Sequence, residues 1–339
     1  MHLSETKRLL ADLSTPSPTA FWRETLATGA VGWLAFGVGM TSRQPAVMAT
    51  AFVVGVAAMF RATTFLHELA HLRSSQAPGV RLAWNLLWGI PLLVPSSLYE
   101  RMHADHHRAN LYGTAADPEY PPLGTQTPAQ VVVWALMGLW LPLLLLFRFA
   151  IVAPLSFIVP GARTFVLARF SALTVNTDYR PRPLKESAQR FALVTELLTM
   201  VAAWGWLALA TVAPNVVLFL AAAMVCNMGL QQLRSMIAHR YLSRGELMNE
   251  DEVHADSYNL VPPSPLLRFV LPVGARLHAL HHVAPAVPFH HLEAAHQRLV
   301  DWLPGDSTYH RATQTSVRAI MSRLFASSRA VSLKTVEAS

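Results

Sequence analysis

The sequence predicts an all-α, multi-pass membrane protein with about four transmembrane helices, and three observations lead to this fold class. Of the 339 residues, 53% are hydrophobic and only 14% are charged, against about 25% charged in an average soluble domain. Several apolar runs approach about 20 residues, the length that a helix needs to cross the hydrocarbon core. The basic residues gather in short segments between these runs, as in the cytoplasmic loops of membrane proteins.

The net charge of +7 does not indicate nucleic-acid binding. The basic residues follow the membrane topology, and no basic patch interleaved with aromatic residues occurs in the sequence. The lone Cys226 lies inside an apolar run, so a disulfide within the chain is excluded. The first residues are polar and contain acidic groups and prolines, which is typical of neither a signal peptide nor a transit peptide.

Four spans are predicted. The first runs from about Thr25 to Met40 and the second from Pro45 to about Leu66, so that together they form a hairpin. The clearest pair runs from Phe191 to Val212 and from Pro214 to Ile237, with only Ala213 between them.

Charge sets the orientation of these spans. The turn at Ala213 is uncharged and is expected outside, whereas the Arg-rich stretch 163–190 is expected in the cytoplasm. The apolar tract 131–159 must then enter and leave on one side, as a re-entrant or in-plane element, and residues 80–100 suit an interfacial segment. We therefore expect a cytoplasmic N-terminal segment (1–24), a membrane domain (25–310) and a peripheral C-terminal tail (311–339).

Nine of the 15 histidines lie in four short motifs, and the topology places all nine at the cytoplasmic surface. The spacings i, i+3 and i+4 put the histidines of each motif on one helical face. The motifs are HELAH (His67, His71), HADHH (His103, His106, His107), HALHH (His278, His281, His282) and the end of the last span (His239).

Two metal-related classes compete for these motifs. HELAH alone has the spacing of zinc proteases, but an intramembrane protease needs a further aspartate ligand, no Asp-Gly dipeptide occurs, and seven histidines would have no role. A metal transporter should carry its sites near the midplane on broken helices, whereas these motifs lie at helix ends. A catalytic zinc takes about three protein ligands, so nine histidines favour two metal ions.

With these motifs, the chain resembles the membrane fatty acid desaturase family, whose integral membrane enzymes carry three histidine boxes. HELAH, HADHH and HALHH match the three boxes, and HALHHVAPAVPFHHLEAAHQRL resembles the third box with the segment that follows it. RSMIAHRY resembles the segment that supplies a further histidine, and DPEYPP and VHADSYNL also resemble family segments. The resemblance covers residues 50–300.

The resemblance implies a cytoplasmic cap with two iron ions that use O2 to desaturate a fatty acyl chain. The metal ligands that the resemblance implies are the eight histidines of the three boxes and His239. A lipid or acyl-thioester is the implied substrate. No HPGG-type haem segment occurs, so a separate ferredoxin or cytochrome b5 type protein is the expected electron donor. Hydroxylases, ketolases and acetylenases of the same superfamily are the alternative.

Several polar residues are expected to support the metal ligands or the substrate. Glu68 is expected to orient a ligand imidazole; Asp105 and Asp256 either do the same or are plain surface carboxylates, and His290 has a supporting or an interfacial role. Polar groups on a membrane helix normally face the protein interior. The stripe of Asn227, Gln231 and Ser235 on the last span is therefore a candidate substrate channel, with helix–helix hydrogen bonding as the alternative.

Overall fold

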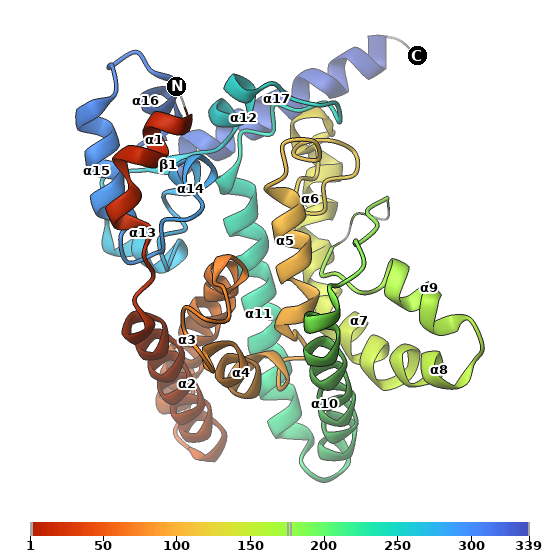
Figure 1. Cartoon of the computed structure of the whole chain (residues 1–339). Helices are drawn as coiled ribbons and strands as arrows, with labels where there is room; N and C mark the ends of the chain where they lie inside the picture. The colour runs from red at the N-terminus through yellow and green to blue at the C-terminus, as the bar shows by residue number, and fades with distance from the viewer. Residues whose placement is uncertain (1–2, 175, 177, 338–339) are drawn as a thin grey trace. The chain divides into compact units, whose positions relative to one another are not determined.

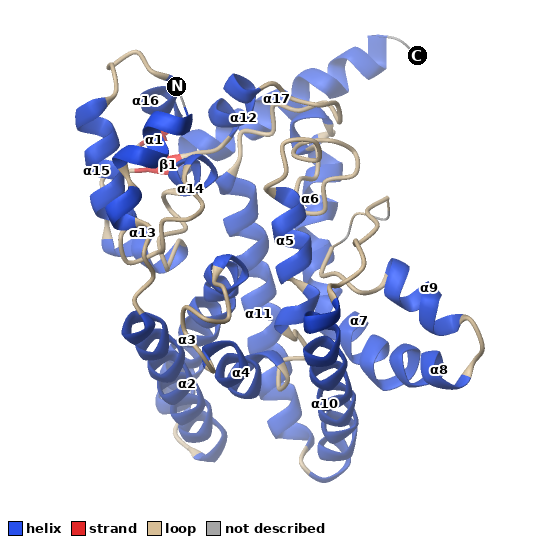
Figure 2. Cartoon of the chain, in the orientation of Figure 1, coloured by secondary structure: helices blue, strands red, loops and turns tan. Residues whose placement is uncertain are grey.

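The computed structural model describes residues 3–174, 176 and 178–337, and nearly all of its regular structure is helical (Figures 1 and 2). The long helices are α2 (Pro18–Thr41), α3 (Pro45–His71), α10 (Glu186–Val212), α11 (Pro214–Ala238) and α17 (Val317–Glu337). The shorter α-helices are α1 (Leu3–Leu9), α4 (Val80–Trp84), α5 (Glu100–His106), α6 (Pro128–Met137), α7 (Leu141–Phe147), α8 (Ala153–Ile158), α9 (Ala162–Arg169), α12 (Glu250–Asp256), α13 (Pro265–Val270), α14 (His278–Val283), α15 (Leu292–Trp302) and α16 (Thr308–Ala312). The predicted all-α class is confirmed.

Short 3-10 and π segments and one small sheet complete the regular structure. The segments are η1 (Ala11–Leu13), η2 (Asn85–Gly89), η3 (Ser96–Leu98), η4 (Leu123–Thr125), η5 (Gly138–Trp140) and η6 (Arg148–Val152). Strands β1 (Asn259–Leu260) and β2 (Thr313–Gln314) pair in parallel.

Among the described residues, four helical runs are long and apolar enough to cross a membrane, which makes the chain a multi-pass membrane protein. They are Pro45–His71, Pro128–Ile158, Glu186–Val212 and Pro214–Ala238. Proline begins three of these runs, at a position where its fixed φ suits a helix and its missing N–H costs nothing. Three of the four agree with the predicted spans.

The fourth run, Pro128–Ile158, differs from the prediction. Helices α6, η5, α7, η6 and α8 follow one another without a break, so the run is long and apolar enough to cross a membrane, whereas a re-entrant or in-plane element was expected. Its two prolines do not interrupt it, because Pro142 lies in the first turn of α7 and Pro154 in the first turn of α8, directly after the π-helix η6. A turn at residues 159–161 ends the run.

Helix α2, the first predicted span, is not among the four. Its apolar stretch, residues 25–40, is shorter than the roughly 20 residues that a full crossing needs, because Glu24 lies at one end and Thr41 at the other. Helix α2 nevertheless packs along α3 (Figure 1). The Arg61 guanidinium of α3 donates to both carboxylate oxygens of Glu24 at 2.5 and 2.7 Å.

Small residues allow α2 and α3 to approach closely. A Cβ atom added at Gly55 of α3 would overlap the ring of Phe36, which is fully buried on α2. We expect Gly55→Ala to destabilise the protein by about 1–3 kcal/mol, because a rigid ring must move in a packed interface. Thermal unfolding in detergent measures the effect. Gly37→Ala is the matched control, since nothing lies within 4 Å of its added Cβ, and an equal loss of stability in both variants would contradict the prediction.

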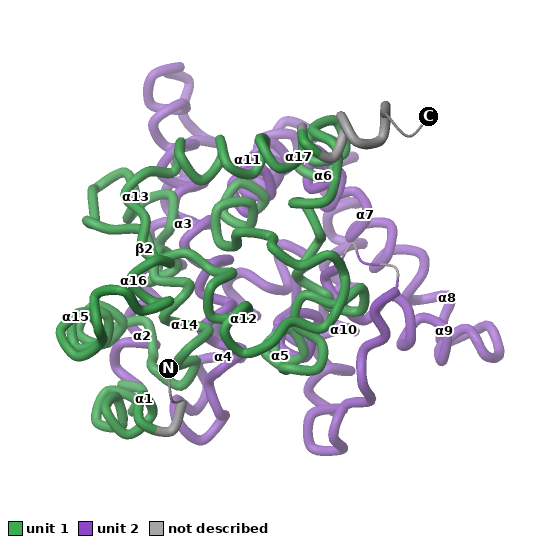
Figure 3. Tube along the Cα trace, turned by 90° about the horizontal axis from the view of Figure 1, so that it is seen from above, with its two compact units in different colours: residues 1–17, 104–135, 232–339 green, residues 18–103, 136–231 purple. Residues whose placement is uncertain are grey.

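The chain divides into two compact units, shown in different colours in Figure 3 and described separately here. Unit 2 comprises Pro18–His103 and Leu136–Gln231. Its core includes the segment after α3, where Trp84 and Trp88 are fully buried and the Trp84 indole donates to the carbonyl of Ala62 at 2.9 Å. Part of the predicted interfacial segment 80–100 thus packs inside unit 2.

Unit 1 comprises Met1–Ser17, Ala104–Ala135 and Gln232–Ser339. One apolar cluster gathers Leu277 and Leu280 around α14 with Leu299 of α15. In two further clusters, Leu324 packs with Tyr112 and Tyr120, and Ile320 with Tyr258. The packing of unit 1 therefore continues into the tail after residue 311, while the predicted three-part division of the chain stays a prediction.

Candidate metal centre

Four histidines of unit 1 converge on one point. A ring nitrogen of each lies within 4.8 Å of a ring nitrogen of every other, and the four are His106, His239, His278 and His282. The Nε2 atom of His278 lies 3.1 Å from Nε2 of His239 and 3.1 Å from Nε2 of His282. The ring of His106 lies 5.4 Å from the His239 ring and 5.1 Å from the His282 ring, centroid to centroid. We call these four residues the unit 1 cluster.

Local structure explains why these four side chains meet. His278 and His282 are the first and fifth residues of α14, so they lie on the same helical face. His106 is the last residue of α5. His239 directly follows α11, where its backbone forms an isolated antiparallel bridge with Ser257. Three helix ends and one short bridge therefore bring the imidazoles together.

A buried carboxylate orients His106. The Nδ1 atom of His106 lies 2.9 and 3.0 Å from the two carboxylate oxygens of Asp117, which is fully buried. Asp117 also accepts the backbone N–H groups of Gly113 and Glu119 at 2.8 and 2.9 Å. Burial lowers the pKa of His106, but the charge of Asp117 and its hydrogen bond outweigh this, so the pKa is raised. Because a carboxylate only accepts, Nδ1 of His106 carries the proton.

A second carboxylate orients His239 through a tyrosine. The hydroxyl of Tyr112 donates to Asp256 at 2.8 Å and lies 3.0 Å from Nδ1 of His239. Since its hydrogen points to Asp256, the hydroxyl oxygen accepts from Nδ1–H of His239. Asp256 also accepts the hydroxyl of Tyr120 at 3.0 Å and the backbone N–H of Leu242 at 2.8 Å. Burial, and then the nearby charge of Asp256, raise the pKa of Tyr112 well above its ordinary value, so the hydroxyl keeps its proton.

When the imidazoles of His106 and His239 are neutral, these hydrogen bonds keep the proton on Nδ1 and place the lone pair on Nε2. The Nε2 atom of His278 lies 3.1 Å from Nε2 of His239 and of His282, so three ring nitrogens converge. In the tautomers that carry a lone pair on Nε2, these nitrogens can bind one metal cation. Imidazole ligands suit zinc, copper, iron and nickel alike. The unit 1 cluster therefore fits a metal ion.

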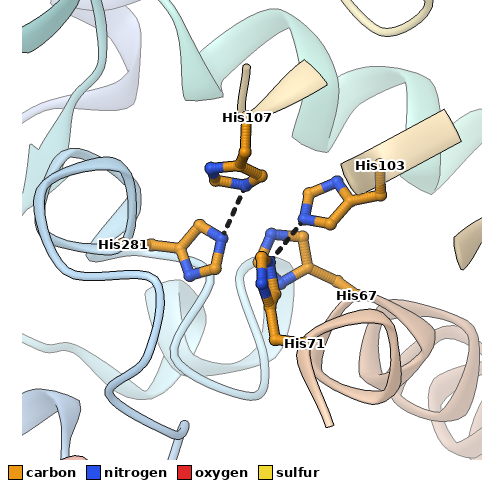
Figure 4. Close-up of side chains that lie close together, drawn as sticks. All are labelled: His67, His71, His103, His107 and His281. Atoms are coloured by element: carbon orange, nitrogen blue, oxygen red, sulfur yellow. Dashed lines mark hydrogen bonds between the residues drawn. The ribbon is translucent and has the colours of Figure 1, made fainter. Parts of the chain in front are cut away.

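Unit 2 contains a second group of imidazoles, His67, His71 and His103, shown in Figure 4. The Nε2 atoms of His71 and His103 lie 2.8 Å apart, and the rings of His67 and His103 have centroids 4.3 Å apart. Nδ1 of His67 lies 3.2 Å from the carboxylate of Glu68, and Nδ1 of His103 lies 3.2 Å from the hydroxyl of Tyr99. Glu68 thus contacts a predicted ligand, and its role in orienting that ligand stays a prediction.

The remaining two box histidines form a pair within unit 1. Nε2 of His281 lies 3.0 Å from Nε2 of His107, and Figure 4 shows the two rings facing each other. Each of the two is adjacent in sequence to a member of the unit 1 cluster, since His107 follows His106 and His281 precedes His282. Consecutive helical residues do not face the same way, so each motif presents imidazoles in two directions.

Asp105 and His290 were also predicted to support the metal ligands. Asp105 is buried, and its carboxylate lies 3.5 Å from the guanidinium of Arg108. His290 accepts the backbone N–H of Ser17 at 3.2 Å, so it contacts the chain just before α2. Their predicted roles beside the metal ligands stay predictions.

The polar stripe of α11 makes contacts between helices. Within unit 2, Thr63 of α3 donates to Asn227 at 3.0 Å and accepts from Gln231 at 2.8 Å. In unit 1, the backbone carbonyl of Ser235 accepts the hydroxyl of Tyr241 at 2.7 Å. These contacts agree with the alternative role of Asn227 and Gln231, which was hydrogen bonding between helices. The substrate-channel role stays a prediction.

The sequence reasoning missed Asp117, Tyr112 and Tyr120 as partners of the ligands. Asp117 and Tyr120 lie in DPEYPP, which begins ten residues after the last histidine of the second box. An acidic residue and a tyrosine in a short polar loop next to a metal box were a usable signal. Tyr112 had none, because only the folded chain brings it to His239, 127 residues away.

The comparisons with known proteins agree with this site. Residues 43–313 match the family model "Fatty acid desaturase", so the chain belongs to the fatty acid desaturase family and is a membrane oxidoreductase. Among curated proteins it is similar to a protein named "Ceramide hydroxylase" from Caulobacter vibrioides (strain NA1000 / CB15N). The two are 36% identical over 337 residues, which cover 97% of this chain and 94% of the relative.

Proposed function

We propose that this protein uses O2 to hydroxylate a ceramide-like lipid at a centre of two iron ions. The observation that carries the proposal is the 36% identity to a ceramide hydroxylase over nearly the full length of both chains. The convergence of four imidazoles in the unit 1 cluster supports it independently.

Two sets of histidines are available for the two ions. The unit 1 cluster would hold one ion. We propose that the remaining box histidines hold the other ion; these are His67, His71 and His103 of unit 2 and His107 and His281 of unit 1. When bound, the iron supplies the oxidising power that an unactivated C–H bond requires and that no amino-acid side chain has.

The protein's own residues hold the ligands in place. Asp117 and Tyr112 keep the Nδ1 protons of His106 and His239 in hydrogen bonds, so the lone pair of each neutral imidazole is on Nε2, the atom that would bind the metal. Partners of this kind fix the tautomer and ring orientation of a ligand and raise its basicity. His106, His239, His278 and His281 are all buried, so the protein shields much of this ligand shell from water.

Hydroxylation and desaturation consume the same reactants but give different products. Hydroxylation consumes one O2, two electrons and two protons, and returns an alcohol and one water. Desaturation consumes the same reactants but removes two hydrogens from the chain and returns two waters. The description of the matching family favours desaturation of a fatty acyl chain as the second candidate. In both cases we propose that a separate ferredoxin or cytochrome b5 type protein supplies the electrons at the cytoplasmic surface, where the Arg-rich segments are expected.

Lipid mass spectrometry tests the reaction. The protein is expressed in a host that contains ceramides, under ordinary and then isotopically labelled oxygen gas. We expect a ceramide that gains one oxygen atom, and the label appears in the new hydroxyl group. A product that has lost two hydrogens and carries no label would overturn hydroxylation in favour of desaturation. Unchanged lipids from cells with iron-loaded protein and a competent electron donor would overturn both.

A further inference from the structure

Unit 2 contains a cavity of about 580 Å³ that the metal centre does not account for. Its walls come from η3, α5, η6, α8, α9, α10 and the segment before α10. Apolar side chains such as Leu98, Phe149 and Leu193 form most of the lining, and a few charged groups are placed among them. A largely apolar pocket with a few convergent polar groups is typical of a ligand site.

Two of the arginines that line the cavity pair with its one glutamate. An Arg163 Nη atom lies 2.6 Å from one carboxylate oxygen of Glu196, and an Arg148 Nη atom lies 3.6 Å from the other. Arg148 is 8% exposed and Glu196 is 7% exposed. Each guanidinium also lies 4.3 Å from the centre of an aromatic ring, Phe149 for Arg148 and Phe157 for Arg163. The stacking fixes the plane of each guanidinium.

The charges in the cavity do not balance. Two guanidinium groups face a single carboxylate, and Arg101 also lines the cavity. Nη1 of Arg148 is buried and has no hydrogen-bond partner among the residues that the structure describes. A buried donor of this kind costs free energy unless something accepts its hydrogen bonds, and burying a charge costs more. An anion in the cavity would satisfy both.

The backbone places Arg148 in the cavity by an unusual local structure. Arg148 is the first residue of the π-helix η6, inside the long apolar run Pro128–Ile158. Single π-helical turns inside α-helices occur frequently at functional sites. Charged residues within apolar membrane helices are costly and usually functional. Both features point to ligand binding by Arg148.

We propose that this cavity binds the phosphate-bearing headgroup of a membrane lipid. Guanidinium groups donate two parallel hydrogen bonds to phosphate oxygens, and these bonds are among the strongest in proteins. The apolar walls suit the first carbons of the lipid chains. The proposal rests on the cavity alone and holds whether or not the protein hydroxylates lipids. The lipid is either the substrate itself or a resident phospholipid, and both present the same phosphate.

Binding of defined lipids to the full-length protein tests the proposal. Native mass spectrometry of the detergent-purified protein compares dioleoyl phosphatidylglycerol with dioleoylglycerol, which has the same chains and no phosphate. We expect the phosphate-bearing lipid to bind about tenfold more tightly or better. Arg148→Gln and Arg163→Gln should each remove most of this preference, because each removes a charged donor. Equal binding of the two lipids would overturn the proposal.

Two further variants separate this site from general surface charge. Arg169→Gln removes the same charge from α9 at an exposed position that does not line the cavity, so it should leave the preference unchanged. Glu196→Gln removes the competing carboxylate, so it should strengthen binding of the phosphate-bearing lipid. A loss in Arg169→Gln equal to that in Arg163→Gln, or weaker binding in Glu196→Gln, would contradict the assignment even if the Arg148 variant failed to fold.

Ceramide and ceramide 1-phosphate identify the source of the phosphate. If ceramide 1-phosphate binds with the same dependence on Arg163 and is converted to product, the headgroup belongs to the substrate. If phosphatidylglycerol binds unchanged while neutral ceramide is converted, the headgroup belongs to a resident lipid. Either result supports a phosphate site. Failure of conversion alone would count against the proposed function and not against the cavity.

Discussion

The His278→Ala variant is expected to lose the metal ion of the unit 1 cluster and almost all activity. The Nε2 atom of His278 is the one that approaches both His239 and His282 at 3.1 Å, so its removal breaks the cluster at its centre. We expect bound iron to fall from about two ions per chain to about one or less. Activity should fall by about three orders of magnitude or more, because the oxidising power comes from the metal and not from side chains. Elemental analysis and lipid mass spectrometry measure the two effects.

His291→Ala is the matched control for this variant. His291 lies next to α15, is half-buried and belongs to neither group of candidate ligands. It should keep its iron and its activity. An unchanged iron content in His278→Ala, in protein that remains folded in the membrane, would contradict the assignment of the unit 1 cluster.

The Asp117→Asn variant is expected to weaken iron binding by about 10- to 100-fold. The amide has nearly the shape of the carboxylate but no charge, and it no longer fixes the proton on Nδ1 of His106. Substitution of such partners of metal ligands typically has an effect of this size. Competition with a chelator measures the affinity. Because the affected histidine belongs to the unit 1 cluster, one of the two ions should be lost more readily than the other.

Two comparison variants make this prediction specific. Asp251→Asn removes a carboxylate from an exposed position on α12 and should not change the affinity. Tyr112→Phe removes the group that accepts the Nδ1–H of His239 but leaves the backbone hydrogen bonds of Asp117 intact. It should also weaken iron binding. If neither Asp117→Asn nor Tyr112→Phe affects iron binding, the proposed role of these hydrogen bonds is wrong.

The positions of the histidines followed from the sequence because they depend on helical periodicity. His278 and His282 are four residues apart on α14, and His67 and His71 are four residues apart on α3, so their shared faces are local properties. The apolar runs of α3, α10 and α11 were found for the same reason. Local patterns of this kind survive folding, since tertiary contacts do not change the period of a helix.

The partners of the histidines could not be found this way. Tyr112 contacts Asp256 across 144 residues of sequence, and only the path of the folded chain makes that contact. Spacing also did not show how the six histidines of HADHH and HALHH divide between two directions. Proline inside a helix usually breaks or kinks it, but in Pro128–Ile158 a 3-10 turn precedes the helix of Pro142 and a π-helix precedes that of Pro154, so the helical assignment is continuous.

The metal content of the purified wild-type protein tests the central claim most directly. Elemental analysis of protein extracted in mild detergent, from cells grown with sufficient iron, is expected to give close to two irons per chain. A single zinc ion per chain with no iron would contradict a two-iron centre and would favour the metalloprotease that HELAH alone suggests.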